Sequence, residues 1–279
     1  MADRVTVVIP IWNRAATIQA AISSALNQTC PPLEVLVCDD GSTDDSRESV
    51  RSLHDPRVQW LPGSRGGRPA IPRNRGIRQS QGEWIAFLDS DDEWRPEKLE
   101  RQLAAATALG CKASCSNALR CVPGRDNTGN LHEWNERGVT LRHLFTVNQV
   151  ICSSVLIHRS LIDVIEGFPE DAKLRALEDY ALWLRVAALT DFAYVNEPLV
   201  VYRDDPVSSV RAEGVHASEQ KRRVLKDFFF WAAKRRTAKL PQYLAGAAIS
   251  IGQSYFKLMR RKFLSAGGRL REGLRRGSG

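Results

Sequence analysis

The sequence lacks the features that mark membrane-spanning and secreted proteins. No run reaches the roughly 18 consecutive apolar residues that a membrane-spanning helix needs; the nearest candidate, residues 243–259, is interrupted by Gln253 and Lys257. No apolar segment with a small-residue cleavage site precedes the first strand-like run, so we expect no secretion signal. The six cysteines follow neither a disulfide framework nor a paired zinc pattern. We therefore expect reduced thiols and a cytoplasmic location.

The sequence also lacks glycines directly after its first strand-like run. Residues 10–17 contain none, whereas the dinucleotide-binding fingerprint of oxidoreductases requires them there. The composition is otherwise that of a globular protein, with 279 residues, 43% of them apolar and 26% charged. Charge is uneven, because residues 1–210 hold 23 basic and 28 acidic side chains and residues 211–279 hold 17 and 4. We expect a folded domain over 1–210 and a basic helical C-terminal extension over 211–279.

Strand and helix patterns alternate through the first hundred residues, and a strand–helix–strand succession is typical of parallel sheets. We predict an α/β fold with a mostly parallel, Rossmann-like sheet and helices on both faces. The expected strands are 5–9, 34–38, 57–61, 84–88, 150–158 and 192–202, and the expected helices are 15–28, 44–53, 74–80, 96–109, 160–165 and 177–189.

Polar clusters follow the first, second and fourth strands at 10–14, 39–42 and 89–92. Because ligands of open α/β sheets bind beyond the carboxyl ends of the strands, we expect these clusters to line one pocket. The aspartates among them repel one another unless a cation or a hydrogen-bonding ligand compensates, and carboxylate oxygens suit Mg²⁺ or Mn²⁺. Each cluster alone is also an ordinary turn or cap sequence. Their shared position after buried strands favours the cation site.

The combination of motifs resembles the inverting glycosyltransferases of family 2, which have the GT-A fold. The resemblance spans roughly residues 4–205 and implies a nucleotide-binding half over 1–109 and an acceptor half over 110–210. The matching elements are Val7-Val8-Ile9-Pro10 with Asn13, residues 24–29, Asp39-Asp40-Gly41-Ser42-Thr43-Asp44, Arg73-Asn74-Arg75-Gly76-Ile77, residues 82–92 with Asp89-Ser90-Asp91-Asp92, and Leu177-Glu178-Asp179-Tyr180.

The resemblance implies a role for each matched position. Asp40 would accept a hydrogen bond from the nucleotide base, and the loop with Pro10, Trp12 and Asn13 would contact base and ribose. Asp89 would lie near the ribose, and Asp91 would hold Mn²⁺ or Mg²⁺ between the two phosphates, where it offsets charge on the leaving group. Arg73 would add a second positive partner. The implied donor-binding set is Pro10, Trp12, Asn13, Asp40, Arg73, Asp89 and Glu178.

Inversion requires a base on the face opposite the leaving group. The family takes it from an acidic pair, which implies Asp179 as the base with Glu178 beside it. Acidic residues at a helix start are also common partners of the helix dipole. The chain departs from many relatives at Asp205, which stands where they have histidine. We expect a UDP-sugar donor and a glycan or lipid-linked acceptor, in surface polysaccharide or glycoconjugate biosynthesis.

Other interpretations concern the whole chain and its tail. A phosphatase using residues 89–91 would leave the acidic site at 39–40 unexplained, and a non-catalytic carbohydrate- or membrane-binding protein is the alternative from another class. In the tail, residues 219–239 place Val224, Leu225, Phe228 and Trp231 on one helical face, and 241–276 again mixes apolar and basic residues. Such faces lie on an anionic membrane surface or pack back on the domain. No binding module for nucleic acid accompanies them.

Overall fold

The computed structural model describes residues 4–122, 124, 129–205, 216–235 and 243. The expected helical stretch 241–276 therefore lies, except for Tyr243, outside the described residues. No helix among the described residues is long and apolar enough to cross a membrane.

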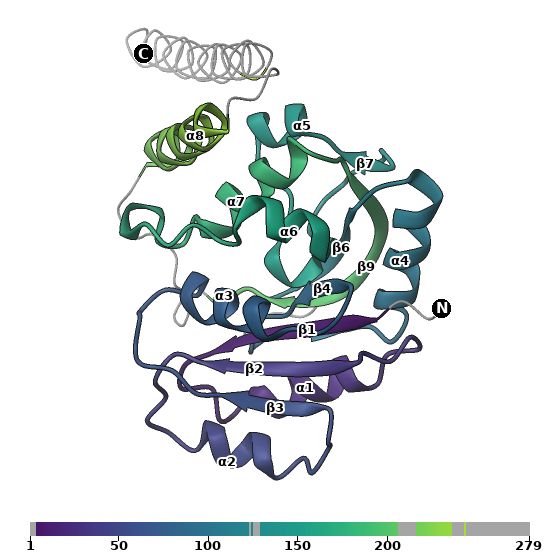
Figure 1. Ribbon diagram of the computed structural model, residues 1–279. Helices are drawn as coiled ribbons and strands as arrows, with labels where there is room; N and C mark the ends of the chain where they lie inside the picture. Colours follow the sequence, from purple (N-terminus) through teal and green to yellow (C-terminus); the bar gives the residue numbers. More distant parts are fainter. Residues whose placement is uncertain (1–3, 123, 125–128, 206–215, 236–242, 244–279) are drawn as a thin grey trace, which may run out of the picture.

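One nine-stranded sheet forms the centre of the molecule, in the order β3-β2-β1-β4-β8-β6-β9-β5 with β7 beside β9 (Figure 1). The first three strands and β4 run parallel, and β6 runs parallel to β9. The remaining pairings, through β8, β5 and β7, are antiparallel. The strands are β1 (Val5–Ile11), β2 (Glu34–Asp39), β3 (Val58–Leu61), β4 (Trp84–Phe87), β5 (Glu93–Trp94), β6 (Ala113–Cys121), β7 (Gly138–Val139), β8 (Leu156–His158) and β9 (Phe192–Arg203).

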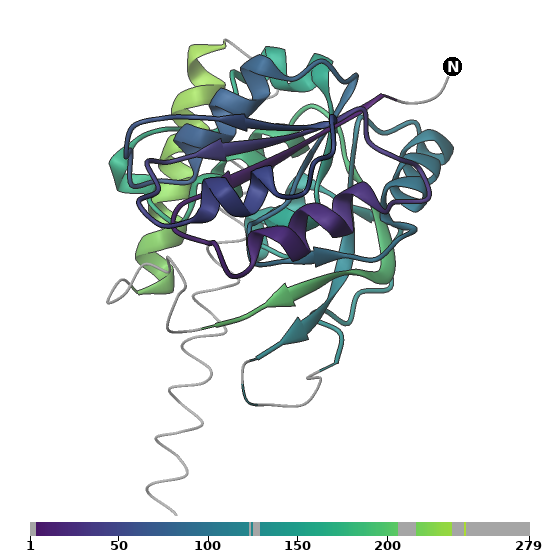
Figure 2. The same cartoon turned by 90° about the horizontal axis from the view of Figure 1, so that it is seen from below.

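Helices cover both faces of this sheet, as predicted (Figure 2). Successive side chains of a strand point to opposite faces, so Val7 and Ile9 of β1 pack with one group of helices and Val8 with the other. The first group is α1 (Ile18–Leu26), α2 (Ser46–Arg51) and α4 (Lys98–Leu109). The second is α3 (Ala70–Gln79), α5 (Leu141–Thr146), α6 (Arg159–Ile165), α7 (Glu178–Ala187) and α8 (Ala217–Lys234). The α/β fold class is confirmed.

The predicted strand at 150–158 is shorter than expected. Residues Cys152–Ser154 form a 3₁₀ turn, here called the serine turn, and only Leu156–His158 pair as β8. In this turn, side chains form the hydrogen bonds that neighbouring strands would otherwise form with the backbone carbonyls. The Trp94 indole donates to the Ser153 carbonyl at 2.8 Å, and Gln102 donates to the Ser154 carbonyl at 2.7 Å. These bonds come from residues distant in sequence, so the local pattern did not reveal them.

Helix α8 packs its apolar face back on the domain. Val224, Leu225, Phe228 and Trp231 are buried, and Arg185 of α7 forms an ion pair with Asp227 at 2.7 Å. Figure 1 shows α8 beside the layer that contains α7. The apolar face that the sequence analysis considered for membrane binding is therefore buried against the protein core, and the alternative of packing on the domain is correct for this face of the helix.

Candidate active site

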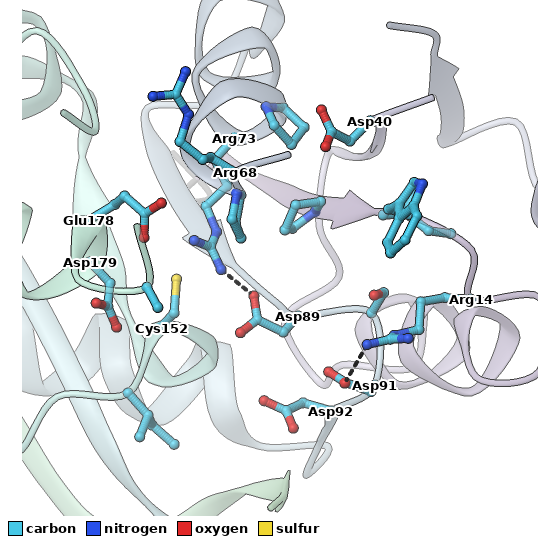
Figure 3. A pocket seen from close by; sticks show the side chains of 18 of the residues that line it. Arg14, Asp40, Arg68, Arg73, Asp89, Asp91, Asp92, Cys152, Glu178 and Asp179 are labelled. Atoms are coloured by element: carbon cyan, nitrogen blue, oxygen red, sulfur yellow. Dashed lines mark hydrogen bonds and ion pairs between the residues drawn. The ribbon is translucent and has the colours of Figure 1, made fainter. Parts of the chain in front are cut away.

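A pocket of about 560 Å³ opens at the carboxyl ends of β1, β2 and β4. Those three strands are parallel neighbours, so the loops that follow them meet at one edge of the sheet. The opposite wall comes from residues 148–152 and 175–179. The pocket brings together the predicted residues Pro10, Trp12, Asp40, Arg73, Asp89, Asp91, Glu178 and Asp179, several of which Figure 3 labels.

Asn13 is placed differently from the other predicted residues. Its side-chain oxygen accepts a hydrogen bond from the backbone amide of Thr43 at 2.8 Å, and its backbone amide donates to the Ser42 hydroxyl at 3.0 Å. Its φ of 51° is left-handed, a conformation that asparagine adopts more readily than most residues. Asn13 is not among the described residues that line the pocket. It joins the loop after β1 to the loop after β2, beside Trp12.

The Asp40 carboxylate is buried and already surrounded by donors. The amides of Gly66 and Gly67 donate to it at 2.8 and 2.9 Å, and the Arg65 guanidinium forms an ion pair with it. The same guanidinium lies over the ring of Trp12, 3.8 Å from its centroid. A side chain at Gly66 would approach the Asp40 carboxylate to 3.2 Å and the end of the Ile71 side chain to 2.5 Å, so it would fit only if Ile71 shifted. Arg65 thus contacts Asp40 and Trp12, two of the residues that the sequence analysis assigned to the nucleotide.

Residues 89–92, here called the aspartate loop, hold three carboxylates at the pocket floor. Asp89 accepts from Arg73 at 2.5 Å, and Asp91 lies 3.7 Å from the Arg14 guanidinium (Figure 3). Burial raises the pKa of Asp91, and the charge of Asp89 raises it further. Burial raises the pKa of Asp92 more strongly, with both neighbouring carboxylates adding to the shift. A cation bound here would relieve this repulsion.

The donor set of the pocket fits a divalent cation held jointly by protein and phosphate. Among the described residues, no group of three or more His, Cys, Asp or Glu side chains is arranged as a complete metal site. At phosphate-binding sites Mg²⁺ is usually held by only one or two carboxylates, and substrate oxygens complete the shell. Asp91 and Asp205 both line the pocket and both offer hard oxygen ligands.

The acidic pair at the start of α7 faces the aspartate loop across Arg73 (Figure 3). Burial raises the pKa of Asp179 to about 6, although the charge of Arg73 opposes the shift. Burial also raises the pKa of Glu178, whose Oε1 has no hydrogen-bond partner among the described residues. A carboxylate whose pKa lies near neutrality suits a general base. Glu178 is buried, and both side chains of the pair line the pocket.

Several pocket residues were missed by the sequence analysis. Arg14 and Arg65 each contact an acidic residue that was predicted, and Cys152 lies beside Arg73 and Asp89. Charge is also added to the pocket by Arg68, Arg175, Arg203 and Asp205, and by Asp92, which belongs to the cluster at 89–92 that was expected there. The only sequence signal was the placement of Arg14 directly after a strand and of Arg65 in the run Ser64-Arg65-Gly66-Gly67-Arg68.

The chain matches the family model described as glycosyl transferase family 2 over residues 6–161. It is 31% identical over 192 residues to the UDP-Glc:alpha-D-GlcNAc-diphosphoundecaprenol beta-1,3-glucosyltransferase WfgD of Escherichia coli, covering 69% of this chain and 73% of that relative.

Two solved structures share the fold. Residues 1–349 of S. aureus TarS, in complex with UDP-GlcNAc, superpose with a TM-score of 0.69 at 20% identity, covering 88% of this chain and 72% of that one. A mannosyltransferase from Pyrobaculum calidifontis, in complex with GDP-Man and Mn²⁺, gives a TM-score of 0.59 at 22% identity, covering 97% and 81%. At these identities the likeness shows the GT-A fold alone.

Proposed function

The chain belongs to glycosyl transferase family 2, and from this we propose that it is an inverting enzyme that transfers a sugar from a UDP-sugar to a hydroxyl of a glycan or lipid-linked acceptor. The observation that carries the proposal is the placement of Asp179, with a pKa of about 6, across the pocket from the aspartate loop. The names of the relatives support a UDP-sugar as the donor, since that of WfgD contains UDP-Glc and TarS was solved in complex with UDP-GlcNAc. The diphosphoundecaprenol in the first name supports a lipid-linked acceptor in surface glycan synthesis.

The proposed chemistry uses two sides of the pocket, the acidic pair with Asp179 on one and the aspartate loop on the other. Asp179 removes the proton of the acceptor hydroxyl, and that oxygen attacks the anomeric carbon of the donor. The bond between this carbon and the β-phosphate oxygen breaks, and the nucleoside diphosphate leaves on the opposite face, which inverts the configuration. Arg73 lies between the two sides, bonded to Asp89, and its positive charge would stabilise the leaving phosphate. A divalent cation held at Asp91 supplies further electrostatic stabilisation of that leaving group.

The proposed function is tested by calorimetric titration of UDP, GDP and dTDP into the full chain, each with and without Mn²⁺, followed by an assay for UDP release from UDP-sugars. We expect UDP to bind most tightly, and more tightly with Mn²⁺. Absence of binding for every nucleotide would contradict the proposal. Binding without release of UDP for any sugar and acceptor would instead favour the non-catalytic carbohydrate- or membrane-binding alternative.

Replacing Arg65 by alanine should tighten UDP binding. Arg65 bonds to Asp40 and covers the ring of Trp12, so a uracil base that contacts both residues would have to displace it. A charge-assisted hydrogen bond and a cation–π contact at a partly exposed site together correspond to about three- to tenfold in affinity. Calorimetry on Arg65→Ala, with Arg78→Ala as a surface control, measures the effect. Weaker binding in Arg65→Ala would show that Arg65 contacts the base directly.

We also propose that the exposed stripe of α8 contacts an anionic membrane surface. Arg222, Lys226, Phe230 and Lys234 are exposed at intervals of four residues, and Phe230 is 75% exposed. Spacing of four places them on one helical face, opposite the buried one. Basic residues near anionic lipid contribute about 1 kcal/mol each.

Phe230→Ser combined with Lys226→Glu should reduce co-sedimentation with phosphatidylglycerol-containing vesicles severalfold. Phosphatidylcholine vesicles should bind neither protein. Val164→Ser with Lys112→Glu, which changes an exposed valine and an exposed lysine elsewhere, is the matched control. Equal loss of binding in both double variants would contradict a specific role for α8.

A further inference from the structure

We propose that Ser153 is a positioning residue, which holds the aspartate loop in the conformation that binds the divalent cation and the donor diphosphate. The inference rests on the proposed function, because it concerns how that site is built. Ser153 is buried, with 1% of its surface exposed, and is not among the described residues that line the pocket. It acts through the loop and does not contact the substrate.

The Ser153 hydroxyl joins the two ends of the aspartate loop. It donates to Oδ2 of Asp92 at 2.5 Å and accepts from the backbone amide of Asp89 at 3.0 Å. A hydroxyl has one proton and two lone pairs, so a single side chain can make both bonds. Asp91, the proposed cation ligand, lies between the two bonded residues. The path of the chain through Asp91 is therefore set from both sides by one oxygen atom.

The serine turn that carries Ser153 is in turn held by side chains of β5 and α4. The Trp94 indole donates to its carbonyl at 2.8 Å, and Gln102 donates to the next carbonyl at 2.7 Å. Fully buried Lys98 lies 4.0 Å from the Trp94 ring centroid and donates to Oε1 of Gln102 at 2.6 Å. These three side chains come from β5 and α4, so the serine turn is anchored on a helix and a strand outside the pocket. The anchor gives the hydroxyl a defined position.

Loss of the Ser153 hydroxyl would break two buried hydrogen bonds, one to the Asp92 carboxylate and one from the Asp89 backbone amide. The Asp89 amide would have lost its Ser153 acceptor, and Asp92 would retain only the Arg203 amide, which donates to Oδ1 at 2.9 Å. Small divalent ions require near-ideal coordination distances, so a loosened loop binds them less well. Loss of a residue that orients a metal ligand commonly lowers metal affinity about 10- to 100-fold. Binding of the nucleoside portion, which uses the Trp12 and Asp40 side of the pocket, should be unchanged.

The neighbouring Ser154 supplies a matched control. It is equally buried and belongs to the same turn, but its hydroxyl donates to the Ile151 carbonyl at 2.8 Å. We would titrate UDP into the wild type, Ser153→Ala and Ser154→Ala over a series of Mn²⁺ concentrations, and uridine into each without metal. The melting temperature of each protein would be measured in parallel.

In Ser153→Ala we expect the Mn²⁺ concentration for half-maximal enhancement of UDP binding to rise about 10- to 100-fold. Uridine binding should be unchanged, and Ser154→Ala should match the wild type in both titrations. Ser153→Thr, which keeps the hydroxyl, should restore most of the Mn²⁺ response. If Ser153→Ala does not fold, Trp94→Phe removes the donor to the Ser153 carbonyl and should shift the Mn²⁺ response in the same direction.

An unchanged Mn²⁺ response in Ser153→Ala overturns the inference, and so does an equal shift in Ser154→Ala. UDP binding to the wild type that is indifferent to Mn²⁺ also overturns it, while the glycosyltransferase proposal stands on the binding itself. Failure of the wild type to bind UDP at any Mn²⁺ concentration contradicts the proposed function. In that case, electron paramagnetic resonance of Mn²⁺ alone tests whether Ser153 positions the aspartate loop. Equal Mn²⁺ binding by the wild type and Ser153→Ala overturns this role, and weaker binding by the variant supports it.

Discussion

Asp179→Asn should lower kcat by about 10²- to 10⁴-fold, the usual contribution of a general base. The amide keeps the size of the side chain but cannot take the acceptor proton. The affinity for UDP should stay within about twofold, because in the proposed mechanism Asp179 acts on the acceptor and not on the nucleotide. Steady-state kinetics with UDP-sugar and calorimetry with UDP measure the two effects separately. Asp163→Asn, which changes an exposed aspartate on α6, is the control.

The pH profile of the wild-type activity tests independently whether Asp179 is the base. A base acts in its ionised form, and the pKa of Asp179 is raised to about 6. kcat/KM should therefore fall as the pH drops through about 6, to about a tenth of its plateau at one pH unit below the pKa. The residual activity of Asp179→Asn should lose this dependence. A wild-type rate that stays constant down to pH 5, or a variant with nearly full activity, would rule out Asp179 as the base.

Asp91→Ala should abolish the enhancement of UDP binding by Mn²⁺ and lower kcat/KM by at least about 100-fold. The side chain lies in the pocket among other carboxylates, and its pKa is raised by burial and, in addition, by repulsion from Asp89. Removing one carboxylate from the group relieves repulsion, so the fold should not be destabilised by loss of its charge. Calorimetry of UDP with and without Mn²⁺ measures the effect on binding, and a thermal melt measures the effect on stability.

Removal of metal from the wild type should reproduce this phenotype. Excess EDTA should lower activity to the level of Asp91→Ala, and Mn²⁺ or Mg²⁺ should restore it in the wild type alone. Asp45→Ala, which removes an exposed carboxylate outside the pocket, should behave as the wild type. Full activity in EDTA, or an Asp91→Ala variant that still responds to Mn²⁺, would contradict a metal role for Asp91.

The sequence predicted the first half of the fold well because its signals are local. Runs such as Val5–Ile11 and Glu34–Asp39 are mostly apolar and are buried at every position, as expected of strands covered on both faces. Acidic clusters directly after β2 and β4 then had to meet at one edge of the sheet. The grouping of Asp40, Asp89 and Asp91 in one pocket followed from strand order, without any knowledge of side-chain contacts.

The sequence by itself determined the α/β class, the family and the acidic residues around the pocket, because strand pattern and motif spacing are written within short segments. Only the tertiary structure decided what those acidic residues contact. Arg65 reaches Asp40 across 25 residues of chain, and Ser153 reaches Asp92 across 61. It also decided that α8 turns its apolar face to the core. Such contacts depend on which distant surfaces pack together, and neither propensity nor periodicity records that.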